Sequence, residues 1–160
     1  MALTKVNRGG LNTGVSDSSN ATFLTVDSSE QAIIKSEGGA STTSVQQGLC
    51  KSWLNFNGTG TIAARDSFNH SGLTDVSQGN HTVTMASAMG NVNYSFGGCC
   101  ATDQNGDGVR VIMFGLNLDG NTLDPNFTTT AYSINGIYAN SGGEEYDIPF
   151  IGTQIFGDLA

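Results

Sequence analysis

The sequence has little proline, few basic residues and no long apolar run. Two prolines and six lysines and arginines stand against 22 glycines and 14 acidic residues, and the net charge is −8. Nucleic-acid binding requires a basic face that neutralises phosphate, so this charge balance excludes it. An anionic membrane surface repels such a chain, and no apolar run approaches the roughly 20 residues of a membrane-spanning helix. We therefore expect neither nucleic-acid binding nor membrane insertion.

Cysteine is also scarce, with Cys50 and the adjacent pair Cys99 and Cys100. An odd number, after a start without the apolar stretch of a secretory signal, argues against a disulfide framework and favours small buried thiols. We expect synthesis in the cytosol. Neither histidine stands at a metal-ligand spacing from these cysteines, so the sequence predicts no zinc site and no cofactor.

Glycine, serine, threonine and asparagine fill the place of the missing charges. Charged residues make up only 12% and hydrophobic residues 38% of the chain, a mixture that favours strands and tight turns around a modest core. From residue 48 onward, short alternating runs are separated by turn residues, a pattern typical of an all-β antiparallel sandwich, either jelly-roll-like or Ig-like. The expected strands are 49–57, 61–68, 73–76, 80–85, 93–98, 109–118, 128–134, 137–140 and 145–156.

Asparagine, aspartate and glycine mark the expected turns between these strands. The strings NGTG, SQGN, NGDG, LDGN and SINGIY all supply residues that tolerate a positive φ. Pro149 cannot donate a hydrogen bond to a neighbouring strand, so it predicts an edge strand or a bulge within the last run.

The first 47 residues differ in composition from the rest. They are rich in serine, asparagine and glycine and hold only two short apolar clusters, so we expect residues 1–47 to be a stem or anchor segment and residues 48–160 to be the sandwich domain. A short helix over SSEQAIIKSE, capped by Ser28 or Ser29, is the local alternative. The string GGASTTSVQQG that follows is interpreted as a connection.

The string DQNGDG at residues 103–108 is similar to the start of a calcium-binding loop. Asp103, Asn105 and Asp107 place oxygen atoms at alternate positions, but Phe114 stands where an EF-hand loop needs a bidentate glutamate. A hairpin turn explains the same residues, and it is the preferred interpretation. A looser calcium site on these three residues stays open as the alternative.

No catalytic motif stands out. His70 and His81 lie in turn-and-strand patterns without a GxSxG string, so we expect exposed, inert histidines. Arg65 and Asp66 are neighbours on an expected strand, so they should point to opposite faces. Paired carboxylates for glycan cleavage cannot be assigned from spacing. We expect no enzyme.

Aromatic residues are the remaining binding candidates. Trp53 shares a strand face with Asn55, where it packs in the core, lies at a seam between subunits, or forms a platform for a sugar. Tyr94, Tyr132 and Tyr138 are further candidates for stacking on a sugar. A carbohydrate-binding module requires such aromatics to be exposed together on one face.

The region from residue 53 to residue 98 contains the strings WLNFNGTGT and RDSFN, and the chain closes with QIFGD at residues 154–158. These strings resemble a segment of tailed-bacteriophage virion proteins, notably tail-fibre and appendage proteins. The resemblance implies a non-enzymatic structural protein of the virion, made in the host cytoplasm and forming a homotrimer, with the sandwich as a knob and the N-terminal segment as its attachment. It implies other virion proteins as partners and, for host adhesion, a host surface glycan. A capsid decoration (cement) protein of similar fold is the alternative, and a carbohydrate-binding module is a further one.

Overall fold

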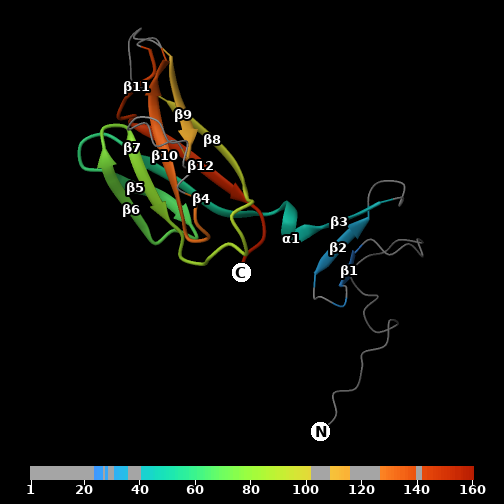
Figure 1. The fold of residues 1–160 in the computed structure, drawn as a ribbon. Coiled ribbons are helices and arrows are strands. Elements are labelled where there is room, and N and C mark those ends of the chain that lie inside the picture. Colours follow the sequence, from blue (N-terminus) through green and yellow to red (C-terminus); the bar gives the residue numbers. More distant parts are fainter. Residues whose placement is uncertain are drawn as a thin grey trace.

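Two antiparallel sheets stacked face to face make up most of the computed structural model, which describes residues 24–26, 28, 31–35, 41–101, 109–115, 127–139 and 142–160 (Figure 1). This confirms the predicted all-β sandwich. The elements are β1 (Leu24–Val26), β2 (Ala32–Lys35), β3 (Thr42–Ser44), α1 (Val45–Gly48), β4 (Cys50–Asn57), β5 (Ala63–Phe68), β6 (Gly72–Ser77), β7 (Asn80–Thr84), β8 (Ser95–Ala101), β9 (Arg110–Phe114), β10 (Ala131–Tyr138), β11 (Glu144–Glu145) and β12 (Phe150–Phe156).

The first sheet of the sandwich has the strand order β5-β4-β12-β8. Its two central strands are the first and the last strand of the sandwich, which pair antiparallel along most of their length. The second sheet has the order β11-β10-β7-β6, and β9 pairs with β10 as well. Ile137 pairs with both β9 and β11, so these two strands lie on opposite edges of β10.

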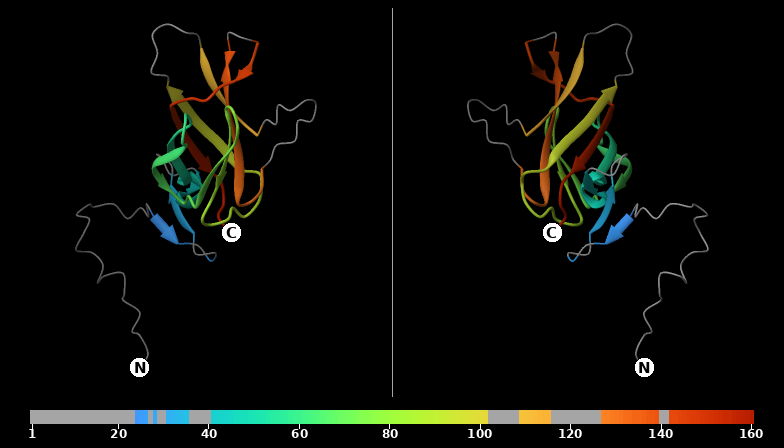
Figure 2. Two further views of the ribbon diagram at one scale, coloured as in Figure 1. Left: turned by 90° about the vertical axis from the view of Figure 1, so that its left-hand side faces the viewer. Right: turned by 90° about the vertical axis from the view of Figure 1, so that its right-hand side faces the viewer.

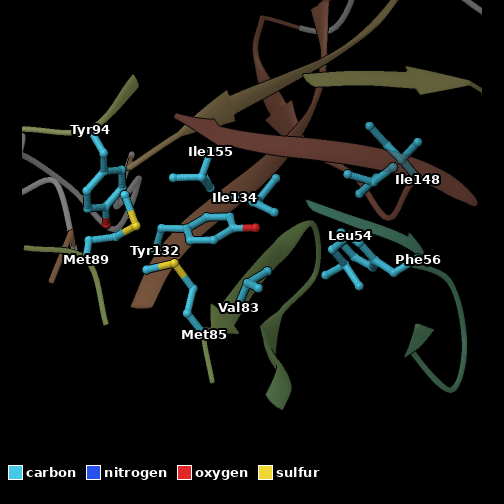
Figure 3. Packing of buried hydrophobic residues seen from close by; sticks show 11 residues of the cluster. Leu54, Phe56, Val83, Met85, Met89, Tyr94, Tyr132, Ile134, Ile148 and Ile155 are labelled. Atoms are coloured by element: carbon cyan, nitrogen blue, oxygen red, sulfur yellow. The ribbon is translucent and has the colours of Figure 1, made fainter. Parts of the chain in front are cut away.

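The core lies between the two sheets (Figure 3). On β4, Leu54 and Phe56 are buried, while the residues that alternate with them, Trp53 and Asn55, are only partly buried. A sheet with one buried face requires this period of two. Buried residues from both sheets and their connections complete the cluster, namely Val83, Met85, Met89, Tyr94, Tyr132, Ile134, Ile148, Ile151 and Ile155.

A small three-stranded sheet, β1-β2-β3, lies outside the sandwich, and α1 connects it to β4 (Figure 1, Figure 2). We call it the N-terminal sheet. Ser44 caps α1 by accepting a hydrogen bond from the backbone N–H of Gln47 at 3.4 Å. The Gln47 side-chain amide donates in turn to Asp158 of the sandwich at 3.2 Å.

The predictions for this N-terminal part need two corrections. The apolar cluster over residues 32–35 is strand β2 and not a helix, because it pairs with a strand on each side. The string interpreted as a connection contains β3 and α1. Local composition does not reveal either element, because each depends on its partners.

Two predictions about strand ends were also wrong. The string SINGIY is not a turn, because β10 continues through Asn135 and Gly136. Pro149 lies immediately before β12, which is a central strand and not an edge, so its missing N–H removes no hydrogen bond from the sheet interior. The register shift in β12 lies at the other end of the strand, between Ile155 and Phe156. The turns predicted around Gly60 and Gly79 are present, with φ of 61° and 71°.

Candidate functional site

The outward surface of the β5-β4-β12-β8 sheet, here called the outer face, carries a candidate binding site. Strand pairing aligns Asp66, Asn55, Gly152 and Cys99 in one row across the four strands. The same pairing gives a neighbouring row, which consists of Phe68, Trp53, Gln154 and Gly97. Residues two apart on a strand share a face, so both rows point away from the core.

A glycine in the central strand β12 leaves a depression in this face. Gly152 in the middle of β12 has no side chain, and a Cβ built there would contact the Cys99 sulfur at 3.3 Å. The result is a groove of about 490 Å³ over β4, β12 and β8, within the range typical of small-molecule sites. Its lining includes the outward-facing residues Trp53, Asn55, Cys99, Phe150, Gly152 and Gln154.

Arg65 holds one end of the groove in place. Its guanidinium lies over the Phe150 ring at 5.1 Å from the centroid, and Nη2 donates to the Pro149 carbonyl at 2.7 Å. The strand pairing of β4 and β5 is irregular next to Asn55, and Arg65 Nη1 reaches the Asn55 side-chain oxygen at 3.5 Å. Arg65 and Asp66 were expected on opposite faces of a regular strand. The strand is bulged at Arg65, which has no partner in the pairing with β4, and its side chain reaches Asn55, the cross-strand neighbour of Asp66.

The four aromatic candidates from the sequence do not come together. Trp53 is half-buried on the outer face and points away from the core. Tyr94 and Tyr132 are 7% and 0% exposed, so they belong to the core and have no face available for a sugar. Tyr138 lies on the other sheet, where its ring and that of Tyr146 flank the Arg110 guanidinium at 3.9 and 4.2 Å.

Sequence reasoning missed Phe150, Gln154 and Gly152 as partners of Trp53. A glycine between a phenylalanine and a glutamine at alternating positions, F-x-G-x-Q, is the local signal that one strand face has a gap between two large side chains. The pairing of that face with Trp53 depends on the register of β4 and β12, which the sequence does not display.

The calcium candidate on Asp103, Asn105 and Asp107 lies outside the described residues. Within the described ranges, no group of three histidine, cysteine, aspartate or glutamate side chains is placed to hold a metal ion. All three cysteines are free. The expectation of buried thiols was wrong for Cys99, which is exposed because it points to the outer face.

His81 is fully buried and His70 is partly buried, so the expectation of exposed histidines was wrong for both. His81 and Val83 are two residues apart on β7, so both side chains point inward. The His81 ring meets the Phe56 ring edge-on, with 5.4 Å between centroids. Within the described part of the chain, neither ring nitrogen has a hydrogen-bond partner, and Nδ1 lies 3.7 Å from Asp75 Oδ1. Burial lowers the pKa of His81 below 6.5, and the carboxylates of Asp75 and Asp147 oppose this shift.

Burial of His81 predicts acid-sensitive stability. In the unfolded chain His81 takes up a proton near pH 6.5, whereas the folded chain resists protonation because its pKa is lowered. The folded state therefore binds fewer protons, and the free energy of unfolding decreases as the pH falls below 6.5, with a slope of up to about 1.4 kcal/mol per pH unit. Urea denaturation at pH 7, 6 and 5 measures this slope.

A variant of His81 tests this assignment. His81→Gln removes the titrating group and should flatten the pH dependence between pH 7 and 5. An unchanged slope in His81→Gln would assign the acid sensitivity to another group and contradict the prediction.

In the described residues no helix is long and apolar enough to cross a membrane. Comparisons of the chain with protein-family models, with curated proteins and with solved structures found no match.

Proposed function

We propose that the chain is a structural, non-enzymatic protein of a phage virion, in which three copies assemble through the N-terminal sheet and the sandwich projects as a knob. Two features support this proposal. The strings WLNFNGTGT, RDSFN and QIFGD resemble those of virion appendage proteins, and the N-terminal sheet has an apolar face that is largely exposed in the part of the chain that the structure describes. The second feature carries the proposed assembly.

The uncovered face follows from the strand register. Leu24 pairs with Ile34 and Val26 pairs with Ala32, so four apolar residues share one face of β1 and β2. Leu24 is 53% and Val26 is 70% exposed. Thr25 points to the opposite face of the same strand.

A sheet this small needs a partner to be stable. Isolated sheets of two or three very short strands bury too little apolar area to offset the entropy of ordering them. If several chains packed their apolar faces together around a symmetry axis, the face of every chain would be removed from water. Three copies is the number that the resemblance to trimeric appendages supports.

The absolute mass of the full-length protein, measured by light scattering after size exclusion, tests the assembly. We expect about 50 kDa, three times the 16.6 kDa of one chain. The double variant Leu24→Asp/Val26→Asp should dissociate it toward 16.6 kDa, because buried unpaired carboxylates are costly.

Thr25→Asp is the control, since it places an aspartate on the opposite face of β1 and should leave the mass unchanged. A full-length monomer would overturn the proposed assembly and favour the alternative of a capsid decoration protein that orders on its particle. A trimer that survives the double variant would show that the N-terminal sheet is not the assembly element.

A further inference from the structure

We propose that the groove on the outer face binds a neutral saccharide. The N-terminal sheet and the virion proposal play no part in this inference, which rests on the side chains around Gly152. A trimer, a monomer or a decoration protein would each leave it standing.

The groove combines a bare floor with aromatic walls. Gly152 leaves the backbone of β12 uncovered, and the adjacent row along the strands carries Trp53 on β4. Phe150 lies two residues away on β12 and is 39% exposed. Residues two apart on a strand are separated by roughly 7 Å, so the two aromatic side chains flank the open backbone between them.

The polar groups at the groove are uncharged amides. Asn55 and Gln154 each carry an acceptor oxygen and a donor NH₂ group. Within the described residues, the Gln154 side chain makes no hydrogen bond, and Asn55 receives only the 3.5 Å contact from Arg65. Two amide groups beside two aromatic rings therefore remain available to a ligand.

This combination selects the ligand class. A pyranose ring presents an apolar C–H face that packs on an aromatic ring, and hydroxyl groups at its rim that both donate and accept hydrogen bonds, as amides do. An apolar ligand would leave the two amides unpaired, which is costly in a closed contact. The residues that line the groove carry no charge, and the Arg65 guanidinium at one end lies against the Phe150 ring and the Pro149 carbonyl, so an ionic ligand would find little counter-charge within the groove.

Arg65 strengthens this assignment. Its guanidinium lies over the Phe150 ring and donates to the Pro149 carbonyl, so its most direct effect on the groove is to hold Phe150 in position. A wall held in place before binding lowers the entropy that a ligand must offset.

The protein reports on this groove through its own fluorescence, because Trp53 is the only tryptophan. The probes are neutral tetrasaccharides of glucose, mannose, galactose and N-acetylglucosamine, with a galacturonate tetrasaccharide as the anionic comparison. We expect at least one neutral probe, at concentrations up to about 10 mM, to shift the Trp53 emission and to protect it from acrylamide quenching. The galacturonate probe should do neither.

Variants locate the binding site, with affinity measured by calorimetry. Gly152→Leu fills the floor, and Gln154→Ala removes an amide from an exposed side chain without filling anything. We expect losses of affinity of at least tenfold for Gly152→Leu and of about three- to tenfold for Gln154→Ala. Phe68→Ala is the control, since Phe68 is a 53% exposed aromatic of the same sheet that does not line the groove; its affinity should stay within about twofold.

Three results would overturn the proposal. No response of Trp53 to any neutral tetrasaccharide would exclude the ligand class. Binding that prefers the anionic probe would contradict the argument from charge. Equal losses in Phe68→Ala and Gln154→Ala, with Gly152→Leu unaffected, would place binding on the open sheet surface outside the groove. A trimeric mass together with no saccharide response would mean that this inference fails while the proposed assembly stands.

Discussion

Gly79→Ala is expected to lower the free energy of unfolding by about 3 kcal/mol or more and the melting temperature by about 10 °C. Gly79 has a φ of 71°, which costs an L-residue about 1 to 2 kcal/mol. A Cβ there would also lie 2.5 Å from the backbone nitrogen of Tyr146 and 2.8 Å from the Gly136 carbonyl oxygen. Both neighbours are backbone atoms, which cannot rotate away as a side chain can.

The crowding at Gly79 occurs where three chain segments are joined by hydrogen bonds. The Gly136 N–H donates to the Gly79 carbonyl at 2.7 Å, and the Tyr146 N–H donates to the Gly136 carbonyl at 2.8 Å. The Gly79 N–H donates to the Asp147 carboxylate at 2.6 Å. Moving any segment to accommodate a methyl group would lengthen these bonds, so the strain has no cheap release.

Gly60→Ala separates the two causes. Gly60 has a similar φ of 61°, but a Cβ there would meet nothing within 4 Å. The free energy of unfolding should therefore fall only by the conformational cost of about 1 to 2 kcal/mol. Thermal and urea unfolding of both variants measure the difference, and equal losses would show that crowding at Gly79 contributes nothing.

The same glycines show why turns were predicted with uneven success. At Gly60 and Gly79 the chain reverses between neighbouring strands, and the local strings NGTG and SQGN contain all the information needed. At Gly136 the string SINGIY has the same composition, yet glycine serves there to let the Tyr146 backbone approach β10. A local pattern identifies the need for glycine but does not say whether a turn or a close neighbour creates it.

The sandwich itself could be predicted because its signal is local. Alternation on β4 separates Leu54 and Phe56 from Trp53 and Asn55 without reference to any other strand. His81 and Val83 follow the same alternation on β7. The inward position of His81 was missed because the prediction relied on its polar residue type and not on its place in this pattern. The period of two was the better guide there.

The groove could be predicted only in part. Trp53 was a candidate from its strand position and its chemistry. Gly152 and Cys99 complete the site from strands about 100 and 50 residues further along the chain, and the alignment depends on the pairing of β12 with both neighbours. Register between distant strands is set by the whole core, so no single stretch of sequence specifies the site.

The second large effect is expected from Tyr132→Ala, which should cost about 3 to 5 kcal/mol in the free energy of unfolding. Tyr132 is fully buried between the sheets (Figure 3). Its ring lies 5.7 Å from that of Phe96 and 6.4 Å from that of Phe114, measured between centroids. Alanine would leave a cavity among aromatic and aliphatic neighbours that cannot collapse without moving both sheets. Urea denaturation measures the loss, and a cost below about 1 kcal/mol would mean that the core repacks around the gap.

Tyr132→Phe isolates the hydroxyl group, which shares a 2.9 Å hydrogen bond with the Thr153 hydroxyl in the core. Phenylalanine keeps the ring but leaves the buried Thr153 hydroxyl without this partner, so a loss of about 1 to 2 kcal/mol is expected. The double variant Tyr132→Phe/Thr153→Val removes both polar groups and should recover part of that loss, because an unpaired buried hydroxyl costs more than a missing pair. Strict additivity of the single variants would contradict the coupling. Burial raises the pKa of Tyr132 to about 12, so stability should fall as the pH rises above 10, and less so in Tyr132→Phe.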